Sequence, residues 1–101
     1  MKCCAPGSLE DKNIVSLADE LAVLAEPNRL RILCLLKKGE RCVCDIFQAL
    51  DLPQNLTSHH LKMLRDAEFL TSRREGTRII YARNERVIKK FHRLLTNSIP
   101  L

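Results

Sequence analysis

Residues 41–83 read RCVCDIFQALDLPQNLTSHHLKMLRDAEFLTSRREGTRIIYAR, and this stretch decides the fold. Apolar residues recur at spacings of three and four in its first half, which indicates two amphipathic helices separated by Asp51-Leu52-Pro53. Its second half holds two strand-like runs around Glu75-Gly76-Thr77, which indicates a hairpin with glycine at its tip. The expected elements are a helix over about 41–50, a helix over 54–67, and strands over 69–74 and 78–83. Two short helices joined by a tight turn and followed by a hairpin predict a winged helix-turn-helix.

The flanking sequence predicts three more helices, which makes the fold mainly α. Ser8 is a candidate N-cap for the first of them, with Asp11 as a partial capping box. Asn28 is a candidate cap for a second helix over about 29–38. The apolar stripes consist of Ile14, Leu17, Ala18, Leu21 and Leu24 in the first helix, and of Val87, Ile88, Phe91, Leu94 and Leu95 in the last. We therefore expect five helices, with the small β-hairpin between the fourth and the fifth.

The predicted helix over 54–67 has an apolar face and a polar face. Its inward residues are expected to be Leu56, His60, Met63, Leu64 and Ala67. Its outward side chains are hydrogen-bonding or cationic, the kind that contacts base edges and phosphates in the major groove. The candidate DNA contacts on this helix are Gln54, Ser58, Lys62 and Arg65, with Thr57 and His59 on the flank. His60 is expected to be a packed, hydrogen-bonded residue, because it falls on the inward stripe.

The predicted hairpin is also basic. Arg73, Arg74 and Arg78 lie near its tip, where they can contact a neighbouring minor groove or a run of phosphates. The formal charge of the chain is +5, which favours a polyanionic partner. A solvated surface explains any one of these cations, but their placement on one helix face and one hairpin favours double-stranded DNA. Three Phe, one Tyr and no Trp argue against a single-strand binder that stacks bases on aromatic rings.

The length and composition limit the number of domains, the cellular location and the role of the cysteines. With 101 residues there is room for one domain, which we expect over residues 9–101 after a flexible arm over 1–8. The absence of an apolar signal region or membrane-spanning run predicts a cytoplasmic protein with no membrane partner. Five cysteines, an odd number, favour thiol or metal chemistry over a disulfide framework. Cys34 is expected to be a small buried hydrophobe, beside Leu30 and Leu33.

Three segments resemble one family of regulators. They are LAEPNRLRIL at residues 24–33, CVCDI at 42–46 and LTSHHLKMLR at 56–65, and in this order they closely resemble the ArsR/SmtB family of winged-helix metal-sensing repressors. The resemblance covers nearly all of residues 15–95. It implies a homodimer that binds operator DNA and is joined mainly through the first and last helices. Such a dimer would account for the apolar faces of both helices in so small a protein.

Cys42 and Cys44 are candidate ligands for a soft ion. On a helical wheel they fall on either side of the core stripe, so packing does not require them. Thiolates suit As(III), Sb(III), Cd(II), Pb(II) and Zn(II) better than they suit hard cations. Residues two apart do not face each other on a regular helix, so joint ligation requires distortion or a place in the frayed first turn. Such distortion would act on the helix over 54–67, which the preceding helix positions.

The resemblance supplies two ways to complete the thiol site. The arsenic-sensing branch of the family carries a third cysteine three residues after Cys-x-Cys, where this chain has Phe47. The branch that responds to cadmium and lead uses cysteines from an N-terminal arm, a role that Cys3 and Cys4 can fill. An adjacent pair suits a three-sulfur As(III) or Sb(III) site better than a tetrahedral ion. We therefore expect an arsenic or antimony inducer, with Cd(II) or Pb(II) as an alternative and an incidental cysteine tail as another.

Other chemistries remain as alternatives or are disfavoured. A thiol redox or persulfide switch could use the same fold by forming a disulfide. The family's zinc site on the last helix is not matched, because Leu95 stands three residues after His92 where a ligand is needed. An enzyme is not expected, because the chain has no Cys-x-x-Cys, no nucleotide-binding glycine loop and no βαβ pattern.

Overall fold

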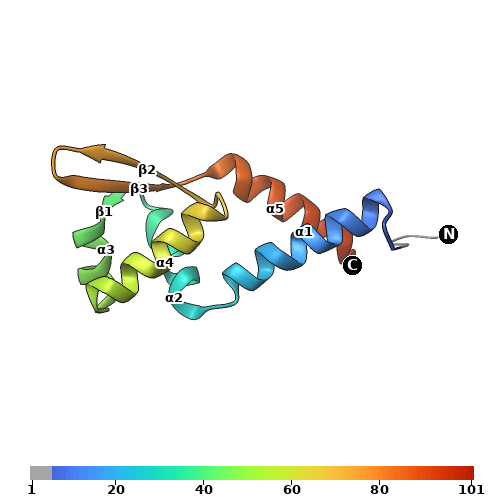
Figure 1. The fold of residues 1–101 in the computed structure, drawn as a ribbon, viewed down its shortest axis with the longest axis horizontal. Coiled ribbons are helices and arrows are strands. Elements are labelled where there is room, and N and C mark those ends of the chain that lie inside the picture. Colours follow the sequence, from blue (N-terminus) through green and yellow to red (C-terminus); the bar gives the residue numbers. More distant parts are fainter. Residues whose placement is uncertain (1–5) are drawn as a thin grey trace.

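The computed structural model describes residues 6–101, and within them the chain forms five helices and three strands (Figure 1). The elements in chain order are α1 (Leu9–Leu24), α2 (Pro27–Leu36), β1 (Arg41–Cys42), α3 (Val43–Leu50), α4 (Gln54–Asp66), β2 (Leu70–Glu75), β3 (Arg78–Arg83) and α5 (Glu85–Ser98). This order confirms the predicted winged helix-turn-helix, with α3 and α4 as the short helices and β2 and β3 as the wing. Cys3 and Cys4 fall outside the described residues.

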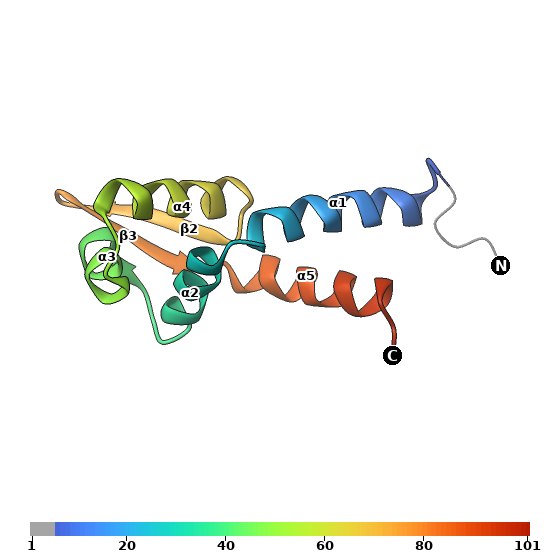
Figure 2. The same ribbon diagram turned by 90° about the horizontal axis from the view of Figure 1, so that it is seen from below.

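The elements form two groups. Figures 1 and 2 show α1 and α5 side by side, extending away from a group that contains α2, α3, α4 and the wing. The largest fully buried apolar side chains belong to that second group and are Ile32, Ile46, Leu61, Leu64, Phe69 and Leu70. The ring of Phe69 meets the ring of Phe91 on α5 edge to face, with centroids 5.6 Å apart. The core therefore lies under α4 and continues to α5.

The wing belongs to a three-stranded antiparallel sheet with the order β1-β3-β2. Glu75 pairs with Arg78 across a two-residue turn, in which Gly76 has a φ of +64°. Glycine adopts this left-handed conformation without the steric cost of a Cβ, which fits the predicted hairpin tip. The strand β1 was not predicted; its Cys42 pairs with Ile80 of β3. A strand of two residues is too short to show an alternating sequence pattern, so it is recognised only through its pairing with β3.

Side chains cap both N-terminal helices. The Ser8 hydroxyl accepts a hydrogen bond from the Asp11 amide at 3.1 Å, which confirms the predicted cap of α1. The cap predicted for α2 was wrong: Glu26, not Asn28, accepts from the Arg29 amide, at 3.1 Å. Pro27 is the first residue of α2, because its fixed φ suits that position and its missing N–H needs no partner there.

The inward face of α4 is rotated from the predicted one. Leu56, which was expected to face inward, is 38% exposed, whereas Thr57 and Leu61 are completely buried. The buried residues of α4 are Thr57, His60, Leu61 and Leu64. They still follow the three-and-four spacing, but taking Leu56 as the first inward residue placed the stripe one position too early.

The prediction for Cys34 on α2 was also wrong, because the residue is exposed. Ile32 and Leu36 face the core, whereas Leu30 is 51% exposed. Apolar residues occupy nearly every side of this helix, so their periodicity did not identify the buried one.

Candidate nucleic-acid interface and thiol site

The outward face of α4 carries donors and cations. As predicted, the side chains of Gln54, Ser58, His59, Lys62 and Arg65 are exposed. Arg65 has one ion-pair neighbour, the carboxylate of Asp66 at 3.8 Å. Pro53 precedes the helix and supplies no side-chain cap, and the Leu56 amide of the first turn donates to Oδ1 of Asn55 at 2.9 Å. Such a face attracts phosphates and offers hydrogen bonds to base edges.

Thr57 does not belong to this face, which corrects its assignment as a candidate DNA contact. The residue is completely buried, and its hydroxyl donates to the Pro53 carbonyl at 3.1 Å. The hydroxyl therefore stabilises the first turn of α4 from the buried side of the helix.

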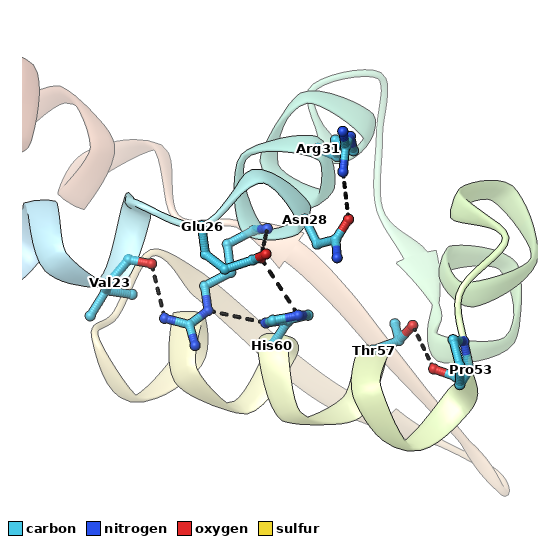
Figure 3. A network of polar contacts seen from close by, with 8 residues as sticks. Val23, Glu26, Asn28, Arg31, Pro53, Thr57 and His60 are labelled. Carbon is cyan, nitrogen blue, oxygen red and sulfur yellow. Dashed lines mark hydrogen bonds and ion pairs between the residues drawn. The ribbon is translucent and has the colours of Figure 1, made fainter.

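A buried polar network holds the middle of α4 (Figure 3). Arg29 donates through Nε to Nδ1 of His60 at 3.1 Å, and through Nη1 to the carbonyl of Val23 at 3.0 Å. Nε2 of His60 lies 3.5 Å from Oε2 of Glu26, the residue that caps α2. Burial is the main cause that lowers the pKa of His60, which keeps the ring neutral. The expectation of a packed, hydrogen-bonded His60 is confirmed, and the network joins α4 to the end of α1 and the start of α2.

The arginines of the wing differ in their contacts. Arg73 is exposed and forms ion pairs with Glu40, which precedes β1, and with Glu75 at 3.0 Å. The hydrogen bond from Arg73 is the main cause that lowers the pKa of Glu40. Arg74 is exposed and makes no hydrogen bond or ion pair with any residue in 6–101. Arg78, also exposed, contacts the thiol region. Arg73, Arg74 and Arg78 therefore face solvent, and Arg73 is partly neutralised by two carboxylates.

Cys42 and Cys44 lie at the start of α3 in different environments. Cys42 belongs to β1 and is 3% exposed, so the prediction that it lies on the helix and that packing does not need it was wrong. Cys44 is in the first turn of α3 and is exposed. Nη2 of Arg78 donates to Sγ of Cys42 at 2.9 Å and lies 3.9 Å from Oδ2 of Asp45. The Cys42 sulfur is the main cause that raises the pKa of the Arg78 guanidinium.

Both thiols line a cavity of about 310 Å³ between α3, α4 and the wing tip. Its lining residues are Cys42, Val43, Cys44, Gln54, Ser58, Thr77, Arg78 and Ile79. Candidate DNA contacts from α4 and the wing therefore share one cavity with the two candidate sulfur ligands. Sequence reasoning missed this neighbourhood, because it depends on how β3 pairs with β1.

The described residues fit a soft-ion site only in part. Residues 6–101 contain no cluster of three or more Cys, His, Asp or Glu side chains that could hold a metal ion. Cys42 and Cys44 supply two sulfurs, whereas a pyramidal As(III) or Sb(III) site needs a third ligand. The expected source, Cys3 or Cys4, lies outside the described residues. Cys34 does not line the cavity, and His92 is exposed on α5.

The helices α1 and α5 leave apolar surface exposed in the single chain. Val15 is 53% exposed and Leu21 is 38% exposed on α1, while Ile99 just after α5 is 66% exposed. Burial is the main cause that raises the pKa of Glu20, which has Lys90 of α5 as a charged neighbour. An apolar surface of this kind on paired helices is typical of an oligomer interface. None of the helices in residues 6–101 is long and apolar enough to cross a membrane.

The order of elements and the basic face of α4 define a winged helix-turn-helix protein of the regulator class. Residues 26–72 match the model of the arsR family of bacterial regulatory proteins. Over 72 residues the chain is 38% identical to the arsenical resistance operon repressor of Staphylococcus aureus, a match that covers 71% of this chain and 69% of that protein. The chain belongs to the ArsR family of transcriptional regulators, which are not enzymes.

Two further comparisons agree with this assignment. The chain is 43% identical over 68 residues to the arsenical resistance operon repressor of Staphylococcus xylosus; the match covers 67% of this chain and spans 65% of that relative. A solution structure from Mycobacterium bovis, described as a homodimeric winged helix-turn-helix DNA-binding domain, matches with a TM-score of 0.68 at 29% identity. That match covers 93% of this chain and 89% of the other.

Proposed function

We propose that the chain is a repressor that binds double-stranded operator DNA as a homodimer and is released when trivalent arsenic or antimony binds its cysteine thiolates. One observation carries this proposal: Cys42 and Cys44 line the same cavity as Gln54 and Ser58 of α4 and Arg78 of the wing. A ligand on these sulfurs is therefore next to side chains proposed to contact DNA. Ligand and operator then oppose each other reciprocally, with a coupling of about 1–3 kcal/mol or more.

The DNA-binding part of the proposal uses two surfaces. The proposed major-groove contacts are Gln54, Ser58, His59, Lys62 and Arg65 on α4, and the proposed phosphate or minor-groove contacts are Arg73, Arg74 and Arg78 on the wing. A second copy, joined through α1 and α5, places two recognition helices roughly 34 Å apart on an imperfect palindrome. The exposed apolar side chains on α1 and after α5 support this mode of pairing.

The choice of inducer follows from sulfur chemistry. Two sulfurs at the start of α3 and one from Cys3 or Cys4 make a three-sulfur set that suits As(III) or Sb(III). Each arsenic–sulfur bond forms as a thiol proton leaves with a hydroxyl group of arsenous acid as water. The relatives named as arsenical resistance repressors support this choice. Cd(II) or Pb(II) replaces As(III) if both arm cysteines join the site.

A release assay tests the proposal. A labelled promoter fragment from the chain's own gene is bound by the full chain under anaerobic, reducing conditions, and As(III), Sb(III), Cd(II), Pb(II) and Zn(II) are added separately. We expect As(III) and Sb(III) to lower the fluorescence anisotropy at the lowest concentrations. Release by Cd(II) or Pb(II) alone supports the alternative inducer. Release only after the reductant is withdrawn identifies a redox or persulfide switch instead.

Cysteine variants locate the sensor within the same assay. Cys42→Ser and Cys44→Ser are expected to keep operator binding and to lose release by arsenite, because each lacks a sulfur ligand. Cys34→Ser is the matched control, since Cys34 is exposed and does not line the cavity. It should keep both properties. Normal release from Cys42→Ser or Cys44→Ser shows that the substituted cysteine is not part of the sensor.

A further inference from the structure

Arg78 is placed by the sheet directly beside the thiol site. In the β1–β3 ladder Cys42 pairs with Ile80, and Arg78 lies two residues away on the same face of β3. At Cys42 the chain leaves β1 and begins α3, so no strand residue covers Arg78 on that side. The guanidinium meets the first turn of α3, where Nη2 is 2.9 Å from Sγ of Cys42 and 3.9 Å from Oδ2 of Asp45.

Arg78 differs from Arg73 and Arg74, the other two candidate DNA contacts on the wing, in the groups that hold its side chain. Arg73 pairs with Glu40 and Glu75, which lie away from the cavity between α3 and α4. Arg74 has no polar partner among residues 6–101. Arg78 therefore joins the wing tip to the buried sulfur, across 36 positions of sequence.

A ligand on Cys42 has to approach the sulfur where Arg78 already binds it. Cys42 is only 3% exposed, and the cavity of about 310 Å³ that it lines is also lined by Arg78. A bond from arsenic to the Cys42 sulfur uses the same electron pairs that accept the hydrogen bond from Arg78, so the two contacts compete for one atom. Thr77, which precedes Arg78 at the wing tip, also lines this cavity.

We propose that Arg78 is a positioning residue that couples the Cys42 sulfur directly to the wing. Its hydrogen bond to the sulfur holds the wing tip in the position that binds operator DNA, and a soft ion on that sulfur displaces it. The inference rests on the proposed function, because it concerns how ligand and operator oppose each other. Ligand binding then lowers operator affinity through the wing, in addition to any change in the positions of α3 and α4.

The first test needs no ligand and uses a double-mutant cycle on operator affinity. Arg78→Gln is expected to lower the affinity about tenfold and Cys42→Ala about threefold, because each removes one partner of the hydrogen bond. The double variant should bind no more weakly than Arg78→Gln alone. Losses that multiply in the double variant overturn the proposed coupling.

Control variants separate the coupling between Arg78 and Cys42 from a general loss of positive charge and from a loss of folding stability. Arg74→Gln removes one wing cation without a partner, so its effect should multiply with that of Cys42→Ala. Cys42→Ser restores an acceptor atom and should recover most of the affinity lost in Cys42→Ala. A Cys42→Ser variant as weak as Cys42→Ala, with an unchanged urea midpoint, overturns the role of the hydrogen bond.

The second test measures arsenite binding to the full chain without DNA, by titration calorimetry. Arg78→Gln should bind arsenite several-fold more tightly than the wild type, because no guanidinium competes for the sulfur, and Arg74→Gln should match the wild type. Equal or weaker arsenite binding by Arg78→Gln overturns the claim that arsenite displaces Arg78 from the sulfur. If the binding is weaker, Arg78 instead supports the sulfur in its ligand-bound state. If the wild-type chain binds no arsenite, the proposed function is overturned. The double-mutant cycle on operator affinity uses no ligand, so it still tests whether Arg78 and Cys42 are coupled.

Discussion

The recognition helix α4 and the wing both carry candidate DNA contacts, but different kinds of contact hold them. α4 is held from inside by Thr57, which is completely buried, and by His60, which is 5% exposed. His60 accepts a hydrogen bond from Arg29, and Thr57 donates one to the Pro53 carbonyl at the start of the helix. On the wing, the side chains of Arg73 and Arg78 are 50% and 59% exposed; Arg73 pairs with exposed carboxylates, whereas Arg78 reaches the buried Cys42 sulfur. The polar side chains that hold α4 are therefore themselves buried, whereas Arg73 and Arg78 make their contacts from exposed side chains.

This difference indicates which surface can adjust. A buried polar group that loses its partner pays its full desolvation cost, so α4 keeps one orientation relative to α2. An exposed ion pair such as Arg73–Glu40 exchanges with water at little cost, so the arginine side chains of the wing can change partners more easily than the residues that hold α4. In the proposed function, sequence readout by α4 and ligand-dependent adjustment of the wing arginines then belong to separate parts of one small domain.

The largest expected effect comes from breaking the buried network. Arg29→Ala removes the donor to Nδ1 of His60 and the donor to the Val23 carbonyl, which leaves two acceptors without this partner. We expect the free energy of unfolding to fall by about 2–4 kcal/mol in urea denaturation. The control is Arg31→Ala, because Arg31 is exposed and, within residues 6–101, bonds only Asn28, three residues away. Equal losses in the two variants would show that the network does not hold α4.

A smaller effect is expected from Thr57→Val, which keeps the shape and removes the hydroxyl. The variant loses the hydrogen bond to the Pro53 carbonyl, so stability should fall by about 1 kcal/mol. Relative affinities for operator fragments with single base changes should not alter, because the side chain is buried. Ser58→Ala, one position along and exposed, is the matched comparison for base preference. A changed preference in Thr57→Val would return this residue to the DNA-contacting set.

The network also predicts a dependence of stability on pH. Burial holds the pKa of His60 below its ordinary value of 6.5, and the charges facing the ring belong to Glu26, Arg29 and His59. As pH falls the unfolded chain takes up this proton before the folded chain does, so folding stability is lost below about pH 6.5. His60→Gln should be less stable than the wild type near pH 7, and the difference should shrink toward about pH 5.

Urea denaturation at a series of pH values gives this difference directly. His92→Gln is the control, because His92 is exposed on α5. Its stability relative to the wild type should not vary over the same range. A constant difference between the wild type and His60→Gln would contradict a depressed pKa for the buried ring.

The sequence was sufficient for the parts of the fold that depend on near neighbours. The spacing of apolar residues in α4 and the glycine at the wing tip are local signals, and they placed both elements within one or two residues. The strand β1 is different, because a two-residue strand exists only through its pairing with β3. Because β1 was not predicted, Cys42 was assigned to a helix and was not expected to be needed for packing. In the structure it belongs to β1 and is buried.

The features of the candidate site also divide into those that local sequence predicts and those that depend on distant contacts. Exposure of Lys62 and Arg65 followed from helical periodicity, whereas burial of Thr57 did not, because its hydroxyl marked it as polar. The contact between Arg78 and Cys42 joins residues far apart in sequence and depends on strand register. No pattern within either segment predicts it. Long-range polar contacts are therefore the part of this site that required a structure.

The smallest expected effect tests how far carboxylates neutralise the wing. Glu40→Gln removes one ion-pair partner of Arg73 and one negative charge from a surface proposed to lie near phosphates. Operator affinity should rise about two- to threefold, with a slightly steeper dependence on salt, because the exposed pair itself stabilises little. Glu85→Gln is the control, since Glu85 pairs with Arg83, whose side chain is only 17% exposed, where the wing joins α5. If both variants raise the affinity equally, the gain reflects net charge alone, and the Arg73 guanidinium does not contact DNA.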